Sequence, residues 1–219
     1  MKISTRSGLS TVTATSANPS ALKSPTAAPL GLGEVASVTV VAKEMAAEAV
    51  KRRPDLLLLV AGEGPALPAL RAQAARLGLG EAVRFTGYLD RHRDLPDCYA
   101  AADVFVFASR TETQGLVLLE AMAVGLPVVA FAEMGTIDIL APRQGCRVPA
   151  EDPAAFADAV VEILSDAALR ARLGSEAWGY ARSWSDEAMS ARLATLYLEY
   201  HKKNGNPAPW KAHTKARPA

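Results

Sequence analysis

The chain has 219 residues, of which 50% are hydrophobic and 21% charged, and this globular composition suffices for one large core or two small ones. All 23 acidic residues but only 16 of the 24 basic residues lie within residues 34–200, so this central part is net negative, which argues against a nucleic-acid-binding function. Cys98 and Cys146 have no Cys or His neighbours at ligand spacing, so neither a disulfide scaffold nor a zinc site is expected.

The expected location is cytoplasmic, because so few cysteines fit a reducing compartment and no stretch reaches the roughly 18–20 uninterrupted apolar residues of a membrane-spanning helix. Residues 1–37 are expected to be a disordered leader, since their beginning is rich in Ser, Thr, Ala and Pro and lacks the apolar region of a secretory signal. Residues 204–219 are expected to be a flexible basic tail, whose charge leaves peripheral contact with the inner face of a membrane open.

From residue 38 onward, helical and strand-like segments alternate. Apolar runs between Gly or Pro predict strands at 56–61, 83–86, 104–107, 126–131 and 145–148. Apolar residues three or four positions apart predict helices at 41–53, 66–77, 94–102 and 115–124. This order predicts right-handed crossovers and the fold class α/β, with a single Rossmann-like, doubly wound parallel sheet that binds ligands outside the carboxyl ends of its strands.

Residues 152–200 have a helical pattern. Pro153 suits the first turn of a helix, and Phe156, Val160 and Ile163 recur on one helix face. We expect these extra C-terminal helices to wrap the sheet rather than to form a second domain, so that one domain covers residues 38–203.

Two carboxylates eight residues apart, Glu112 and Glu120, flank the start of a predicted helix that follows a predicted strand. A carboxylate in the position of Glu120 can accept two hydrogen bonds from a vicinal diol such as a ribose. The first turn of the helix has free N–H groups that suit a phosphate or diphosphate. These N–H groups belong to Gly115, Leu116 and Val117.

This segment resembles the Glu-x7-Glu signature of retaining, nucleotide-sugar-dependent glycosyltransferases with the GT-B fold, the group 1 family. Further segments resemble motifs of that family in the family's order. They are a strand and Gly-x-Gly-Pro turn at 57–65, a strand and base-binding turn at 83–89, a Tyr-x-x-Ala-Asp-Val-Phe-Val run at 99–106, and a Pro-Val-Val segment followed by Gly and an acidic Ile-Leu at 127–140. The resemblance covers about residues 41–200 and implies the C-terminal, donor-binding half of a GT-B fold.

The resemblance implies that Glu112 faces the transferred sugar and Glu120 the ribose, while the backbone at Tyr88 and Leu89 meets the base. The other positions that it assigns to the donor are Gly62, Gly64, Thr113, Gln114, Gly115, Leu116 and Val117. The turn at Gly62 and Gly64 also fits a structural role. No metal and no cofactor are expected, since the chain contains no Asp-x-Asp.

The implied function is transfer of a hexose from a nucleotide-sugar such as UDP-glucose to an acceptor, with retention. A lipid or polysaccharide precursor is the expected acceptor, because the sequence Thr-Gln-Gly at 113–115 resembles the family members that glucosylate lipids. The implied partner is an N-terminal, acceptor-binding lobe on another chain, since residues 1–40 are too few to form one.

The alternative is a truncated remnant or partner subunit that binds a nucleotide-sugar without transferring it. The family has an Arg and a Lys in the loop after the first strand, and an ungapped alignment places Gly31 and Ala36 at those positions. Neither residue can neutralise a diphosphate. A nucleotide-sugar epimerase of the same fold is a third interpretation, against which the Glu-x7-Glu context argues.

Overall fold

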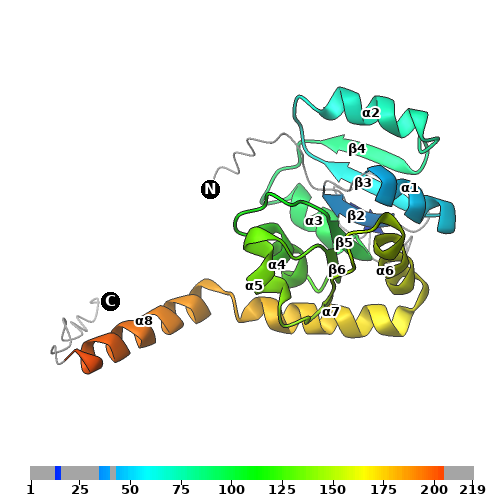
Figure 1. Cartoon of the computed structure of the whole chain (residues 1–219). Coiled ribbons are helices and arrows are strands. Elements are labelled where there is room, and N and C mark those ends of the chain that lie inside the picture. The colour runs from blue at the N-terminus through cyan, green and yellow to red at the C-terminus, as the bar shows by residue number, and fades with distance from the viewer. Residues whose placement is uncertain (1–12, 16–34, 40–42, 205–219) are drawn as a thin grey trace, which may run out of the picture. The chain divides into compact units, whose positions relative to one another are not determined.

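The computed structural model describes residues 13–15, 35–39 and 43–204. The chain divides into two units, residues 1–181 and 182–219. The first unit contains the sheet and the helices around it (Figure 1). In the second, helix α8 (Asp186–Lys203) is capped at its N-terminus by Ser185, whose side chain accepts a hydrogen bond from the N–H of Ala188.

The described residues of the first unit form one sheet of seven strands, in the order β4-β3-β2-β1-β5-β6-β7. The strands are β1 (Thr13–Thr15), β2 (Val35–Thr39), β3 (Leu57–Ala61), β4 (Val83–Gly87), β5 (Val104–Phe107), β6 (Val128–Ala130) and β7 (Cys146–Arg147). Strands β2 and β5 also pair directly and in parallel, with Ser37 opposite Phe105. The doubly wound sheet is therefore confirmed. The expectation that it is parallel throughout is wrong for β1, which runs antiparallel to β2 and β5.

Strand β1 and the first three residues of β2 fall within residues 1–37, where no regular structure was expected. Strand β2 is central, since it pairs in parallel with both β3 and β5. The sequence pattern did not indicate β2, because Ala, Ser and Thr interrupt its apolar run. Ala36 lies in this strand rather than in the loop after it, so the ungapped alignment misplaces it. That loop, residues 40–42, and Gly31 lie outside the described residues.

The predicted helices of the alternating part are present with small differences at their ends. They are α1 (Lys43–Arg52), α2 (Leu67–Arg76), α3 (Asp94–Ala100) and α4 (Leu116–Ala123), followed by α6 (Pro153–Ser165) and α7 (Ala167–Arg182) in the C-terminal part. A short 3-10 helix, η1 (Met134–Thr136), and α5 (Ile137–Leu140) follow β6 and were not expected. No described helix is long and apolar enough to cross a membrane.

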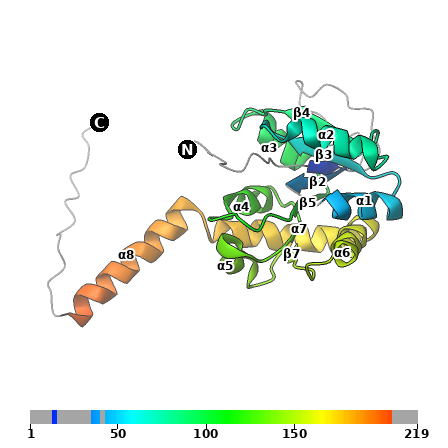
Figure 2. The ribbon, with the colours of Figure 1, turned by 45° about the horizontal axis from the view of Figure 1, so that its top comes forward.

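The two faces of the sheet are covered by different helices (Figures 1 and 2). Because side chains alternate along a strand, Val104 and Val106 of β5 pack in one cluster with residues of α1 and α6. Phe105, between them, faces the opposite way and contacts Tyr99 of α3, with ring centroids 5.6 Å apart. All four residues of β5 are almost fully buried, as expected for a strand covered on both faces.

The sequence also explains how α6 and α7 begin and dock. Asp152 caps α6 by accepting a hydrogen bond from the N–H of Ala155 at 2.8 Å, and Pro153 occupies the first turn as predicted. Helix α7 buries Leu169 and Leu173 along one face. The expectation that helices after residue 152 cover the sheet therefore holds for α6 and α7.

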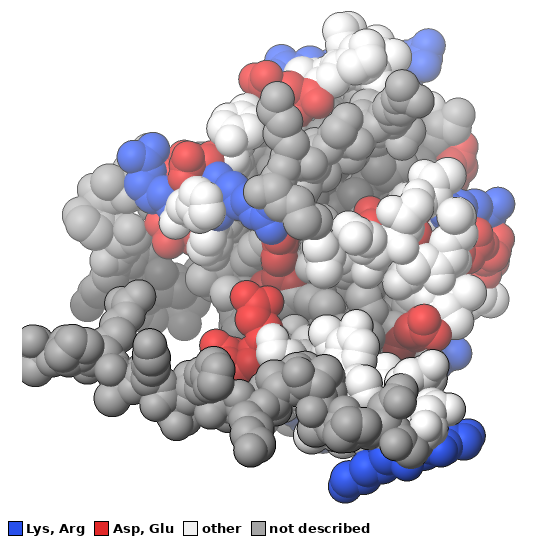
Figure 3. Space-filling view, turned by 90° about the vertical axis from the view of Figure 1, so that its left-hand side faces the viewer, with Lys and Arg blue, Asp and Glu red and all other residues white. Residues whose placement is uncertain are grey.

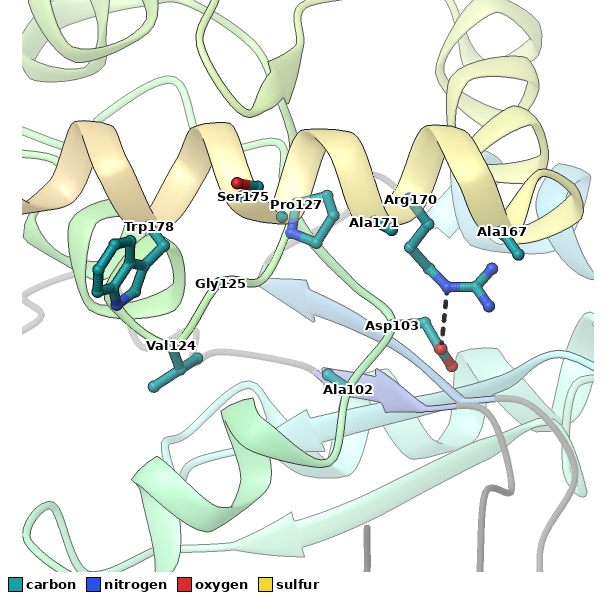
Figure 4. Close-up of a pocket in the computed structure, with 11 residues that line it drawn as sticks. Ala102, Asp103, Val124, Gly125, Pro127, Ala167, Arg170, Ala171, Ser175 and Trp178 are labelled. Carbon is teal, nitrogen blue, oxygen red and sulfur yellow. Dashed lines mark ion pairs between the residues drawn. The ribbon is translucent and has the colours of Figure 1, made fainter. Parts of the chain in front are cut away.

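A pocket of about 670 Å³ lies at the amino ends of β5 and β6, between these strands and α7 (Figure 4). It is lined by Ala102, Asp103, Val124, Gly125, Pro127, Ala167, Arg170, Ala171, Gly174, Ser175 and Trp178. At one end, the Nε atom of Arg170 lies 3.4 Å from Oδ1 of Asp103. A further nitrogen of Arg170 donates to the carbonyl of Leu164 at the C-terminus of α6. This ion pair thus joins the start of β5 to the junction between α6 and α7.

The free energy of unfolding of the Asp103→Asn variant, measured relative to that of the wild type, is expected to be higher at neutral pH than at acidic pH. Burial raises the pKa of Asp103 to about 6, against the opposing charges of Arg170 and Arg53. Because the pKa of Asp103 is higher in the folded than in the unfolded protein, protonation of Asp103 stabilises the fold at pH values below the unfolded-state pKa. This contribution is lost as the pH rises through about 6. Asparagine does not titrate, so only the wild type loses this contribution. Between pH 4.5 and 7.5, the free energy of unfolding of the variant should therefore rise by about 1–2 kcal/mol relative to that of the wild type.

Urea unfolding of both proteins at several pH values measures this difference. Asp158→Asn is the control, because the side chain of Asp158 is 71% exposed. A stability difference between Asp103→Asn and the wild type that does not vary with pH would contradict the assignment.

Candidate functional site

The topology places a switch point between β2 and β5. Strands β3 and β4 are added on one side of β2, whereas β5, β6 and β7 extend the sheet on the other side. Loops that follow adjacent strands diverge at such a point, which is where parallel α/β sheets bind ligands. We refer to the loops after β3, β4, β5 and β6 as the carboxyl edge. The arrowheads of β3 and β4 in Figure 1 point to this side, and Figure 3 looks onto it.

The loop after β5 carries Glu112, which is half-buried and bonds to its own loop. Its Oε1 atom accepts hydrogen bonds from the N–H groups of Gln114 and Gly115, at 2.9 and 3.0 Å. Gly115 has a φ of +69°, a conformation that glycine adopts without strain, and α4 begins at the next residue. The N–H of Gly115 was expected to be free for a phosphate. In the structure the carboxylate of Glu112 occupies it.

The loop after β6 supports the loop after β5 by close backbone contact. The N–H of Gly135 donates to the carbonyl of Glu112 at 3.0 Å. A Cβ atom added to Gly135 would lie 2.1 Å from the carbonyl oxygen of Thr113, so only glycine fits there. The hydroxyl of the fully buried Thr136 accepts from the N–H of Glu133 and lies 3.0 Å from the carbonyl of Phe131, which folds this second loop.

Glu120 of α4 meets the turn after β4. Its Oε1 atom forms an ion pair with Arg91, and its side chain is 25% exposed. Its second oxygen, Oε2, is buried and accepts no hydrogen bond from any residue of the described part of the chain. Buried polar atoms nearly always have a partner, so this oxygen is an acceptor that a ligand could satisfy. The sequence pattern did not point to Arg91, because the two residues are 29 positions apart.

The remaining sequence-predicted residues lie along the same edge of the sheet. Gly62 directly follows β3, and its N–H donates to the carbonyl of Gly87 at the end of β4, at 2.6 Å. Gly64 lies in the turn that leads to α2, where its carbonyl accepts from the N–H of Leu67. After β4, Tyr88 is 71% exposed and Leu89 is half-buried.

Residues Thr113, Gln114, Leu116 and Val117 lie around the start of α4, where Thr113 and Gln114 are exposed. Glu112 and Glu120 have different partners, so each of them connects a different pair of elements at the carboxyl edge. The loops after β5 and β6 meet through Glu112, and the turn after β4 meets α4 through Glu120.

Acidic side chains gather near the middle of the face in Figure 3. On the loop after β5, Arg110 lies 2.6 Å from an oxygen of Glu151 and 4.0 Å from one of Glu133. A hydrogen bond with Glu151 raises the pKa of Glu133, which Arg110 opposes. Within the described ranges, no group of three or more His, Cys, Asp or Glu side chains could hold a metal ion.

The two cysteines lie in α3 and β7, outside the carboxyl-edge loops. Neither Cys98 nor Cys146 forms a disulfide. Burial raises the pKa of the Cys146 thiol to about 11, which keeps it protonated at neutral pH.

Comparisons with known proteins agree with this topology. A family model described as "Glycosyl transferases group 1" matches residues 30–166. The chain is 36% identical over 164 residues to D-inositol 3-phosphate glycosyltransferase from Corynebacterium efficiens, and the match covers 70% of this chain and 38% of the relative.

Solved structures share the fold. Sucrose-phosphate synthase from Thermosynechococcus elongatus is 27% identical, with a TM-score of 0.61 over 74% of this chain and 42% of that chain. The Anabaena protein HepE, solved in complex with UDP and glucose, is 23% identical, with a TM-score of 0.58 over 73% of this chain and 45% of that chain. The chain thus spans about two fifths of the length of the proteins that it matches.

Proposed function

The chain belongs to the glycosyl transferases group 1 family, and from this premise we propose that it is the donor-binding half of a GT-B hexosyltransferase that acts with retention. One observation carries the proposal for the site. The Oε2 atom of Glu120 is buried without a partner in the described chain, on the helix that follows the switch-point strand β5. A ribose hydroxyl is the group that would satisfy it.

In the proposed complex, the nucleotide lies along the carboxyl edge. The base meets the backbone at Tyr88 and Leu89, near the turn formed by Gly62 and Gly64, and the ribose meets Glu120. The diphosphate lies at the N-terminus of α4, where backbone N–H groups and the helix dipole favour negative charge.

The diphosphate lies next to the segment formed by Thr113, Gln114, Gly115, Leu116 and Val117. Since the Glu112 carboxylate already bonds to the N–H groups of Gln114 and Gly115, those of Leu116 and Val117 are left for the phosphates. Glu112 faces the sugar in this arrangement. As the nucleoside diphosphate departs, the N-terminus of α4 stabilises its developing charge.

The donor class that we propose is a UDP-hexose, and the HepE structure, which was solved in complex with UDP and glucose, supports this choice. The proposed acceptor is a lipid or polysaccharide precursor, held by an acceptor-binding lobe outside this donor-binding half. Transfer of a hexose to such an acceptor would place the protein at the cytoplasmic face of a membrane. The proposed reaction uses no cofactor.

Titration calorimetry with UDP tests the proposal. The wild-type chain should bind UDP with a submillimolar Kd, and Glu120→Ala should weaken binding by about tenfold to a hundredfold, because a charge-assisted hydrogen bond is lost. Glu81→Ala is the control, since Glu81 is exposed in the loop before β4. Lack of binding to the wild type at millimolar UDP would contradict the proposal.

The alternative, a chain that binds the donor but transfers nothing, makes the same binding prediction. Sugar transfer distinguishes the two. Release of UDP coupled to glycosylation of an acceptor supports a transferase, whereas tight UDP binding without turnover over a broad acceptor panel supports the binding-only alternative.

A further inference from the structure

We propose that Arg91 is a positioning residue of the nucleotide site, which holds one oxygen of Glu120 and directs the other to a single ribose hydroxyl. This inference rests on the proposed function. It concerns how the carboxylate is presented, which depends on contacts between the turn after β4 and helix α4.

The first step is that the two carboxylate oxygens of Glu120 have different surroundings. Arg91 pairs with Oε1 of Glu120, while Oε2 is buried without a hydrogen bond from the described residues. A carboxylate held at one oxygen cannot rotate freely. The guanidinium therefore fixes the direction in which Oε2 faces, and only this oxygen still lacks a donor.

The second step is the position of the two residues in the fold. In the sheet, β4 and β5 are separated by other strands, and the chain returns from one to the other through α3. Arg91 is three residues after Tyr88, on the turn proposed to meet the base, and Glu120 is on the helix proposed to meet the ribose and diphosphate. The ion pair spans these two elements and so sets the separation between the base contact and the ribose contact.

The third step is electrostatic. Both side chains are partly buried, at 34% exposure for Arg91 and 25% for Glu120, so their attraction is screened less than that of a fully exposed pair. An unpaired carboxylate there would repel the diphosphate of a bound nucleotide. Arg91 reduces this repulsion while leaving Oε2 able to accept a hydrogen bond.

A double-mutant cycle on UDP binding tests the proposal. Arg91→Ala should raise the Kd for UDP about tenfold, and Arg91→Lys, which keeps the charge, should recover part of the affinity. Because Arg91 acts through Glu120, Arg91→Ala should have no further effect in a Glu120→Ala background. Arg93→Ala is the matched control from the same turn, since Arg93 pairs with Asp94 instead.

Deoxynucleotides test the single-hydroxyl contact. For the wild type, one of 2′-deoxy-UDP and 3′-deoxy-UDP should bind about tenfold more weakly than the other. In Arg91→Ala, this ratio should fall toward one, because Glu120 is no longer held in one orientation. A folding defect would weaken both nucleotides equally and leave the ratio unchanged, so the ratio separates positioning from stability.

Three results would overturn the proposal. The first is that Arg91→Ala leaves both the UDP affinity and the deoxynucleotide ratio as in the wild type. The second is that Arg91→Ala weakens UDP binding as much in the Glu120→Ala background as in the wild-type background, which would show direct contact of Arg91 with the nucleotide. In both cases the wild type still binds UDP, and the proposed function stands. If the wild type does not bind UDP, the proposed function itself fails and this inference fails with it.

Discussion

Gly135→Ala is expected to abolish UDP binding and to destabilise the protein by about 3 kcal/mol. The added Cβ would lie 2.1 Å from the carbonyl oxygen of Thr113 and 2.5 Å from the backbone nitrogen of Gln114. These are backbone atoms of the loop that begins α4, so they cannot move without displacing the proposed diphosphate contacts. The hydrogen bond from the N–H of Gly135 to the carbonyl of Glu112 would also be strained.

Calorimetry with UDP and urea unfolding measure the two effects of this substitution. Gly80→Ala is the control, because no atom lies within 4 Å of its added Cβ and its φ is not positive. It should change the free energy of unfolding by less than about 1 kcal/mol. If Gly135→Ala lost stability but bound UDP as the wild type does, the loop after β5 would not belong to the donor site.

Gly145→Ala should cost the protein about 2–5 kcal/mol while leaving the affinity for UDP unchanged. Gly145 has a φ of +65°, which strains an alanine, and an added Cβ would lie 2.4 Å from the backbone nitrogen and Cα of Ala177 in α7. The carboxylate of Glu176 accepts from the N–H of Gly145, so the same contact holds α7 against the start of β7. The clash would loosen this docking at the amino end of β7, at the opposite edge of the sheet from the carboxyl-edge loops.

Urea unfolding measures the loss of stability, and limited proteolysis should show earlier cleavage within α7. The Kd for UDP, measured at a temperature where the variant is folded, should stay within about twofold of the wild-type value. Together, the two glycine variants separate an effect on the proposed site from an effect on stability alone. Equal loss of UDP affinity in both would contradict the assignment of the site to the carboxyl edge.

Local patterns were sufficient to predict most elements. The apolar runs that became β3, β5 and β6 are short and bounded by Gly, Pro or polar residues, which are signals carried by neighbouring positions. The two strands that were not predicted, β1 and β2, lack such runs. They form because backbone groups pair across the sheet, an interaction that depends on strands distant in sequence.

The sequence by itself determined the alternation of helices and strands from α1 to β6, and the positions of Glu112, Gly115 and Glu120 around the start of one helix. Only the tertiary structure decided the contacts of their side chains. Glu112 bonds to the N–H groups of its own loop, and Glu120 pairs with Arg91 from the turn after β4. Periodicity and turn chemistry act over a few residues, whereas an ion pair between residues 29 positions apart requires the sheet to bring two loops together.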